Sequence, residues 1–132
     1  SVIGLWESTC FECFIKPPQS NSYYEFNFSP EGHWDCFFFN KPGDQLKECE
    51  LAQRPKIDLS MDQGEFTLTV EINTQKLKPD FWNDQSMEFG LTTVIEDQKN
   101  TLSYWAIKHL DEKPNFHNFK SFEKITKTST LQ

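Results

Sequence analysis

Long hydrophobic runs are missing from the 132-residue sequence: no stretch approaches the roughly 20 apolar residues that a helix needs to cross a bilayer. No signal-peptide pattern, internal repeat, low-complexity tract or linker is visible either. We therefore expect one soluble domain, residues 1–132, cytoplasmic rather than secreted or periplasmic, that buries roughly two-thirds of its unfolded surface. The chain starts at Ser1 rather than Met, which leaves a removed upstream segment open as an alternative.

Basic residues are scarce relative to acidic ones. The chain has 13 Lys and Arg against 20 Asp and Glu, for a net charge of −7, and residues 1–66 hold most of the excess. An acidic domain repels phosphate backbones and anionic lipid head groups, so we expect neither nucleic acid nor a membrane as a partner. An uncharged ligand is easier for such a surface to accommodate.

Catalytic motifs are also absent. The sequence has no G-x-S-x-G nucleophile elbow, no H-E-x-x-H zinc motif and no glycine-rich phosphate loop. A glycosidase-like pair of carboxylates could be assembled from Glu12 and Glu25 if their strands are neighbours. Two acids on adjacent strands are more often a solvated face or an ion site. The sequence therefore predicts a protein that is not an enzyme.

The four cysteines do not form a recognisable metal or redox motif. Cys10 and Cys13 have the C-x-x-C spacing, but their flanking residues are typical of a strand, which would point the two thiols to opposite faces. Cys36 and Cys49 lie thirteen positions apart and do not supply the second close pair of a zinc site. We expect ordinary buried thiols, with their redox state left open.

Aromatic residues are abundant, and 13 of them are Phe, which favours a β protein. Residues 22–39 predict a hairpin that turns at Ser29-Pro30-Glu31-Gly32, because Pro suits the second position of a turn and Gly tolerates positive φ. In the first strand of this hairpin, Glu25 and Asn27 alternate with aromatic residues. They therefore predict a polar face opposite a core face of Tyr24, Phe26 and Phe28.

Period-2 alternation and turn residues mark further strands along the chain. The pattern is clearest at residues 65–72, where Phe66, Leu68, Val70 and Ile72 alternate with Glu and Thr. A polar stretch at residues 40–56 reads as a long loop, and residues 77–82 as one helical turn. We predict an all-β fold, an antiparallel β-sandwich with little helix, with strands also at residues 9–16, 57–61, 86–95, 101–108 and 122–126.

Candidate ligand contacts come from polar residues in aromatic surroundings. Glu12 is a carboxylate in the middle of an aromatic strand, so it must be solvent-facing, paired or part of a site. His109 and His117 could ligate a metal with Asp111 or Glu12, but histidines in polar loops more often form local hydrogen bonds, so no metal site is predicted. Four tryptophans could be core residues or flat platforms for a sugar ring: Trp6, Trp34, Trp82 and Trp105.

Two segments carry a resemblance to a known family. The first contains Leu5-Trp6, Cys10-Phe11-Glu12-Cys13-Phe14 and then Tyr24-Glu25-Phe26-Asn27-Phe28 before Gly32. The second runs from Leu102-Ser103-Tyr104-Trp105 through Asn115-Phe116-His117 to Phe122. In order and in type, these motifs resemble the DOMON-like domains related to family 9 carbohydrate-binding modules, over about residues 5–126.

The resemblance implies a jelly-roll or immunoglobulin-like β-sandwich that binds a ligand without catalysis. Its sugar-binding members hold a glycan between tryptophans, with polar side chains on the hydroxyls. We therefore expect a small carbohydrate or another uncharged molecule as the ligand and no cofactor. The candidate residues are Trp105, His117, Glu12, Glu25 and Asn27, followed by Trp34, His109 and Trp6.

Two alternatives stay open. Other DOMON domains bind haem through Met and His, which would point to Met61 or Met87 with His109 or His117 and imply an electron-transfer domain. The family also usually has one or two strands before the Leu-Trp motif, whereas this chain has four residues there. The resulting open sheet edge could pair with an upstream strand or a second copy, so a protein-interaction module is the other alternative.

Overall fold

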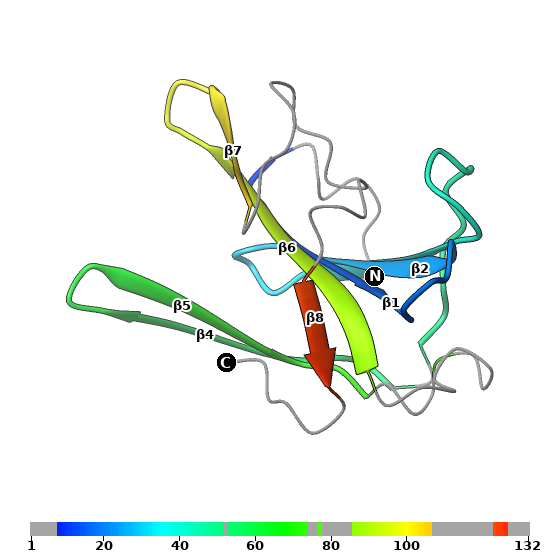
Figure 1. The fold of residues 1–132 in the computed structure, drawn as a ribbon. Helices are drawn as coiled ribbons and strands as arrows, with labels where there is room; N and C mark the ends of the chain where they lie inside the picture. Colours follow the sequence, from blue (N-terminus) through cyan, green and yellow to red (C-terminus); the bar gives the residue numbers. More distant parts are fainter. Residues whose placement is uncertain (1–7, 52, 74–76, 78–85, 107–122, 127–132) are drawn as a thin grey trace.

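The computed structural model describes residues 8–51, 53–73, 77, 86–106 and 123–126, and these residues contain strands and no helix (Figure 1). Accordingly, no helix long and apolar enough to span a membrane occurs among them. The predicted helical turn at residues 77–82 lies outside the described residues except for Leu77. The strands are β1 (Cys10–Lys16), β2 (Tyr23–Phe28), β3 (Trp34–Phe39), β4 (Lys56–Asp62), β5 (Glu65–Glu71), β6 (Ser86–Glu96), β7 (Leu102–Ala106) and β8 (Glu123–Thr126).

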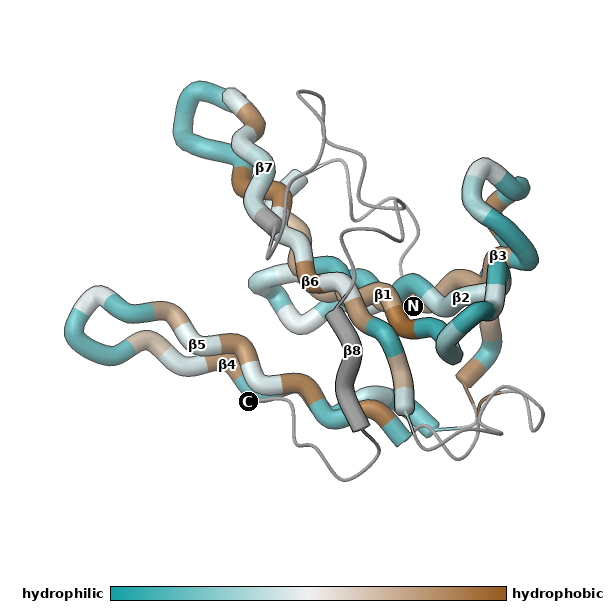
Figure 2. Tube along the Cα trace, in the orientation of Figure 1, coloured by the Kyte–Doolittle hydropathy of each residue, from teal (hydrophilic) through white to brown (hydrophobic). Residues whose placement is uncertain are grey.

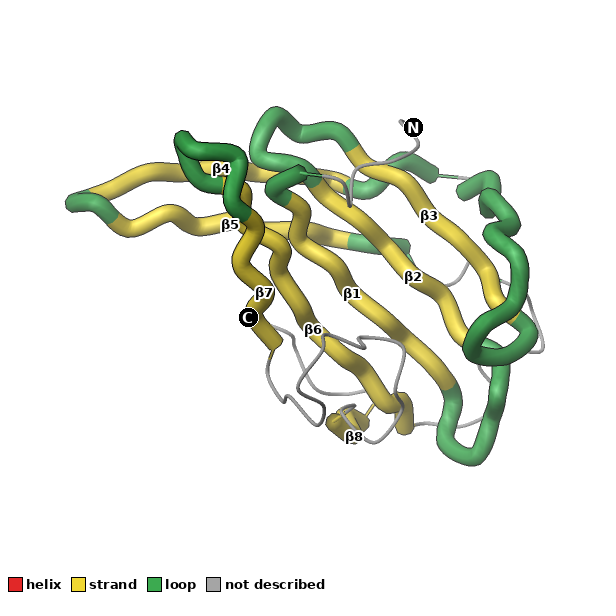
Figure 3. The backbone as a smooth tube through the Cα atoms, turned by 90° about the horizontal axis from the view of Figure 1, so that it is seen from above, coloured by secondary structure: helices red, strands yellow, loops and turns green. Residues whose placement is uncertain are grey.

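Six strands form one antiparallel sheet in the order β3-β2-β1-β6-β7, with β8 pairing beside β7 along β6 (Figure 3). The remaining strands, β4 and β5, form a separate antiparallel hairpin that crosses below the large sheet in Figure 1. The predicted all-β antiparallel class is therefore confirmed.

The β2–β3 hairpin forms as predicted, with its reversal at Ser29–His33. The Gly32 amide donates to the Ser29 carbonyl at 3.0 Å, and the Ser29 amide donates to the His33 carbonyl at 2.9 Å. The Ser29 hydroxyl also accepts from the His33 amide. Gly32 has a φ of +83°, a left-handed conformation that glycine adopts without steric cost. This turn fixes the register that places Asn27 opposite Asp35.

One face of the large sheet, called the core face, packs against the β4–β5 hairpin. Figure 2 shows the alternation of apolar and polar residues along β4 and β5 that this packing requires. Phe11 of β1 stacks on Phe66 of β5 with 5.6 Å between ring centroids. Each fully buried aromatic contributes on the order of 2 kcal/mol. The buried core-face cluster is Cys13, Ile15, Tyr24, Phe26, Phe28, Cys36, Phe38 and Leu77, and Ile57, Leu68, Val70 and Ile72 pack against it.

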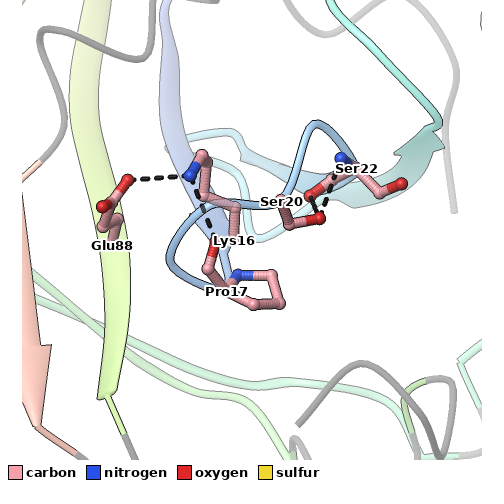
Figure 4. A network of polar contacts seen from close by, with 5 residues as sticks. All are labelled: Lys16, Pro17, Ser20, Ser22 and Glu88. Carbon is pink, nitrogen blue, oxygen red and sulfur yellow. Dashed lines mark hydrogen bonds and ion pairs between the residues drawn. The ribbon is translucent and has the colours of Figure 1, made fainter. Parts of the chain in front are cut away.

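The opposite face, called the polar face, carries both aromatic and charged side chains. A second buried cluster of Phe14, Tyr23, Phe37 and Phe39 occupies part of it, and Tyr23 and Phe39 stack at 4.8 Å. Beside this cluster, the ammonium of Lys16 pairs with Glu88 of β6 at 2.8 Å and donates to the Pro17 carbonyl at 3.1 Å (Figure 4). The Lys16 side chain is only 4% exposed, so this ion pair ties β1 to β6 in a desolvated setting.

Candidate functional site

A row of polar side chains crosses the polar face of the large sheet. Thr92 of β6 lies opposite Glu12 of β1, Glu12 lies opposite Asn27 of β2, and Asn27 lies opposite Asp35 of β3. Opposed residues in an antiparallel sheet project from the same face, so the four side chains are neighbours. Glu25 lies two positions before Asn27 and projects from the same face of β2. We call these five residues the polar cluster.

Hydrogen bonds satisfy only part of the polar cluster. The Thr92 hydroxyl donates to Glu12 Oε2 at 2.9 Å, and the Asn27 amide nitrogen donates to Glu25 Oε1 at 3.0 Å. All five residues are buried, and Asn27 and Asp35 are 0% exposed. Within the described part of the chain, Asn27 Oδ1 and both carboxylate oxygens of Asp35 have no hydrogen-bond partner. The cluster thus presents three buried acceptor atoms without donors.

Burial dominates the electrostatics of the cluster. Desolvation raises the pKa of Glu25 from 4.5 to about 8, against the hydrogen bond from Asn27 and with a further rise from Glu12 and Asp35. Desolvation likewise raises the pKa of Glu12 from 4.5 to about 7, with the Thr92 hydrogen bond acting in the opposite sense. For Asp35 the pKa rises from 3.8 to about 6, mainly through burial and partly opposed by the nearby Asn27 amide. At pH 7 these values leave Glu25 mostly protonated, Glu12 partly protonated and Asp35 mostly ionised.

The cluster offers hydrogen-bonding groups rather than a nucleophile or a metal site. Cys10 projects beside it, but burial, followed by the charge of Glu12, raises the pKa of its thiol well above the ordinary value. Cys13 is on the core face, so the two cysteines point to opposite sides of β1 as predicted, and burial raises its pKa to about 12. Neither thiol is activated as a thiolate. No group of three or more His, Cys, Asp or Glu residues that could hold a metal ion occurs among the described residues.

The structure brings together only some of the predicted site residues. Glu12, Glu25 and Asn27 are neighbours, as the sequence suggested, but they are buried in the sheet rather than exposed on an open wall. Asp35 and Thr92 belong to the same cluster and were not among the predicted residues. The alternation of Asp35 with Trp34 and Cys36 was the available signal for Asp35, while nothing near Thr92 marked that residue.

The predicted tryptophans do not join this cluster. Trp105 lies opposite Thr93 and therefore projects from the core face, where it is 60% exposed and donates from Nε1 to Ser103 Oγ at 3.1 Å. Trp105 and Glu25 thus project from opposite faces of the sheet and do not line a single groove. Trp34 lies opposite Phe28 and packs against the buried core. Trp6, His109 and His117 lie outside the described residues and remain predictions.

The two methionines of the haem alternative, of which one would pair with His109 or His117, lie in different surroundings. Met61, near the tip of the β4–β5 hairpin, is 70% exposed, whereas Met87 packs against the core cluster. Other exposed apolar side chains accompany Met61 on the side of the core face: Phe66, Leu91, Ile95 and Trp105.

Comparison with solved structures shows a protein of similar fold. The chain is similar to the crystal structure of a "putative carbohydrate-binding protein" from Bacteroides uniformis, with a TM-score of 0.67 over 93% of this chain. The two sequences are 17% identical, and the chain spans 62% of the length of that protein. No family model and no curated protein matches the sequence. The comparison thus shows a shared β fold.

Proposed function

We propose that this protein is a non-catalytic carbohydrate-binding domain and that its polar cluster contacts the hydroxyl groups of the ligand. The observation that carries this proposal is a set of buried acceptors that have no donor among the described residues, Asn27 Oδ1 and the two Asp35 carboxylate oxygens. A buried acceptor without a donor costs about 1–3 kcal/mol. Sugar hydroxyls are donors, and a ligand whose binding uncovers these buried atoms and supplies donors to them would recover this free energy.

The electrostatics of the chain favour a neutral ligand. The protein has a net charge of −7, and the polar cluster contains three carboxyl groups within two rows of the sheet. A glycan that carries carboxylates or sulfates would bring like charges together in a poorly solvated place. Neutral sugars avoid this repulsion. The fold shared with the Bacteroides protein supports the same class of ligand.

The burial of Glu12 and Glu25 supports binding rather than glycoside hydrolysis. A retaining glycosidase needs one ionised carboxylate beside one protonated carboxyl group, in a site that water can enter. Glu12 and Glu25 both have raised pKa values and are 7% and 5% exposed. Burial from water therefore makes both a poor fit to this mechanism, and the raised pKa keeps Glu25 mostly protonated at neutral pH.

A glycan array of neutral and anionic sugars, followed by calorimetric titration, tests the proposal. We expect neutral glycans to bind the wild type. We expect Glu25→Gln to change the affinity for these glycans by less than the removal of a charged acceptor would change it. This variant keeps an acceptor oxygen and removes only the acid. Far-UV circular dichroism serves as the folding control. Failure of every glycan to bind would contradict the proposal.

A second candidate is a protein-interaction module, favoured by the exposed apolar side chains on the core-face side. Five large apolar residues there are more than a third exposed: Met61, Phe66, Leu91, Ile95 and Trp105. Contiguous exposed apolar surface often marks an association site. Light scattering tests this candidate: a monomer at high concentration that binds glycans supports the first proposal alone.

A further inference from the structure

Two of the four cysteines face each other at the edge of the large sheet. Phe37 of β3 forms an antiparallel bridge with Glu48, which lies in the long loop after β3. The Cys49 amide donates to the Cys36 carbonyl at 2.8 Å, and the Phe38 amide donates to the Lys47 carbonyl at 3.0 Å. These two bonds flank the bridge, so Cys36 and Cys49 are directly opposed.

This arrangement has a backbone separation that a disulfide can span. Opposed residues at a hydrogen-bonded position of an antiparallel pair have Cα atoms about 5.5 Å apart. Disulfides span Cα separations of about 4.4–6.8 Å, so the backbone would need little movement. Both side chains lie on the core face, because Cys36 belongs to the core cluster and Cys49 packs against it.

The two thiols also differ in access. Cys36 is 0% exposed, and burial followed by the adjacent Cys49 thiol raises its pKa far above the ordinary value. Cys49 is half-buried and therefore more accessible to a dissolved reagent. A more accessible attacking thiol next to a buried second thiol is an arrangement in which a mixed disulfide can be resolved within the protein.

We propose that Cys36 and Cys49 form a cross-strand disulfide when the protein meets a small disulfide oxidant such as oxidised glutathione. The Cys49 thiolate attacks the oxidant, which releases one glutathione thiolate and leaves a mixed disulfide on Cys49. Cys49 in the mixed disulfide no longer carries the charge that helped to raise the Cys36 pKa. Cys36 then loses its proton as it attacks the Cys49 sulfur, and the second glutathione thiolate is released. The two thiol protons end on the two glutathione molecules, so one disulfide is reduced as one is formed.

The other two cysteines cannot compete for this pairing. Cys10 and Cys13 project from opposite faces of β1, and Cys13 is separated from Cys36 by Phe26 in the register. The Cys36–Cys49 bond would close the loop of residues 37–48 covalently onto β3. Because Asp35 precedes Cys36 on β3, the bond would also fix one end of the polar cluster.

Peptide mapping after oxidation tests the proposal directly. Wild-type protein is incubated with oxidised glutathione, its remaining thiols are alkylated after unfolding, and it is cut with a protease specific for glutamate. This cleavage separates the four cysteines into residues 8–12, 13–25, 32–48 and 49–50. We expect residues 32–48 linked to 49–50, with Cys10 and Cys13 alkylated.

Thermal unfolding supplies the second measurement, with Cys49→Ser as the matched control. Closing a loop of this length should raise the unfolding midpoint of the wild type by roughly 10 °C. The variant should show neither the linked peptide nor the rise. Recovery of Cys49 as a glutathione adduct with Cys36 alkylated would overturn the proposal. So would a linked peptide that involves Cys10 or Cys13. The wild-type map decides the question even if the variant folds poorly.

Discussion

The buried carboxyl groups predict that the protein becomes more stable as the pH falls from 8 to 5. The folded-state pKa values of Glu25, Glu12 and Asp35 are raised to about 8, 7 and 6. In this range the folded state holds more protons than the unfolded state. The free energy of unfolding therefore decreases as the pH rises through these values, because ionisation favours the unfolded chain.

The size of the effect follows from the shifts. For Glu25, whose pKa moves from 4.5 to about 8, lowering the pH from 7 to 5 adds about 2.5 kcal/mol of stability. Glu12 contributes about 2 kcal/mol by the same relation. The carboxyl groups interact, so their contributions do not simply add, and we expect about 3–5 kcal/mol in total. With a typical slope of the unfolding free energy against urea concentration, this corresponds to a shift of the unfolding midpoint by roughly 2 M urea.

Urea unfolding followed by tryptophan fluorescence at pH 5, 6, 7 and 8 measures this dependence. Glu25→Gln is the matched control, because it keeps the side-chain shape and the acceptor for Asn27 but cannot ionise. Its unfolding free energy should vary less with pH than that of the wild type. A wild-type free energy that is flat or rises from pH 5 to 8 would refute the reasoning. If the unfolding free energy of the variant varied with pH as steeply as that of the wild type, Glu25 would not contribute to the effect.

Two further predictions concern residues outside the polar cluster. Glu88→Gln leaves the buried Lys16 ammonium without its carboxylate and should lower the unfolding free energy by about 1–3 kcal/mol. Lys56→Ala is the control, because it breaks an ion pair with Glu71 in which both side chains are about 70% exposed. This variant should change the unfolding free energy little. Gly32→Ala forces a residue with a Cβ to keep a φ of +83°, although nothing lies within 4 Å of the new atom. The variant should lower the unfolding free energy by about 1–2 kcal/mol in the same urea assay. An unchanged midpoint would show that the turn can rearrange.

Local patterns were sufficient to predict the strands. The β2–β3 hairpin, its turn at Gly32 and the core face of Tyr24, Phe26 and Phe28 all follow from alternation and turn chemistry within a short segment. These features depend on contacts between residues close in sequence. The strand predicted at residues 101–108 is likewise present over Leu102–Ala106, the part that the structure describes.

The composition of the polar cluster depends on long-range pairing, which local patterns do not contain. Thr92 reaches Glu12 because β6 pairs with β1 across 80 positions of sequence. The face from which Trp105 projects is set by the same β6 register, since alternation within β7 cannot tell which side meets the core. The opposition of Cys36 and Cys49 likewise arises where a loop returns to the edge of β3.

The central claim is that ligand hydroxyls donate to the unpartnered acceptors of Asp35 and Asn27. It is tested most directly by the dissociation constant of one neutral glycan for the wild type, Asp35→Asn and Trp105→Ala. The account predicts that Asp35→Asn weakens binding by roughly 10- to 100-fold, the loss expected for a hydrogen bond to a charged acceptor, while Trp105→Ala on the opposite face leaves it unchanged. Loss of binding in Trp105→Ala with full affinity in Asp35→Asn would contradict it.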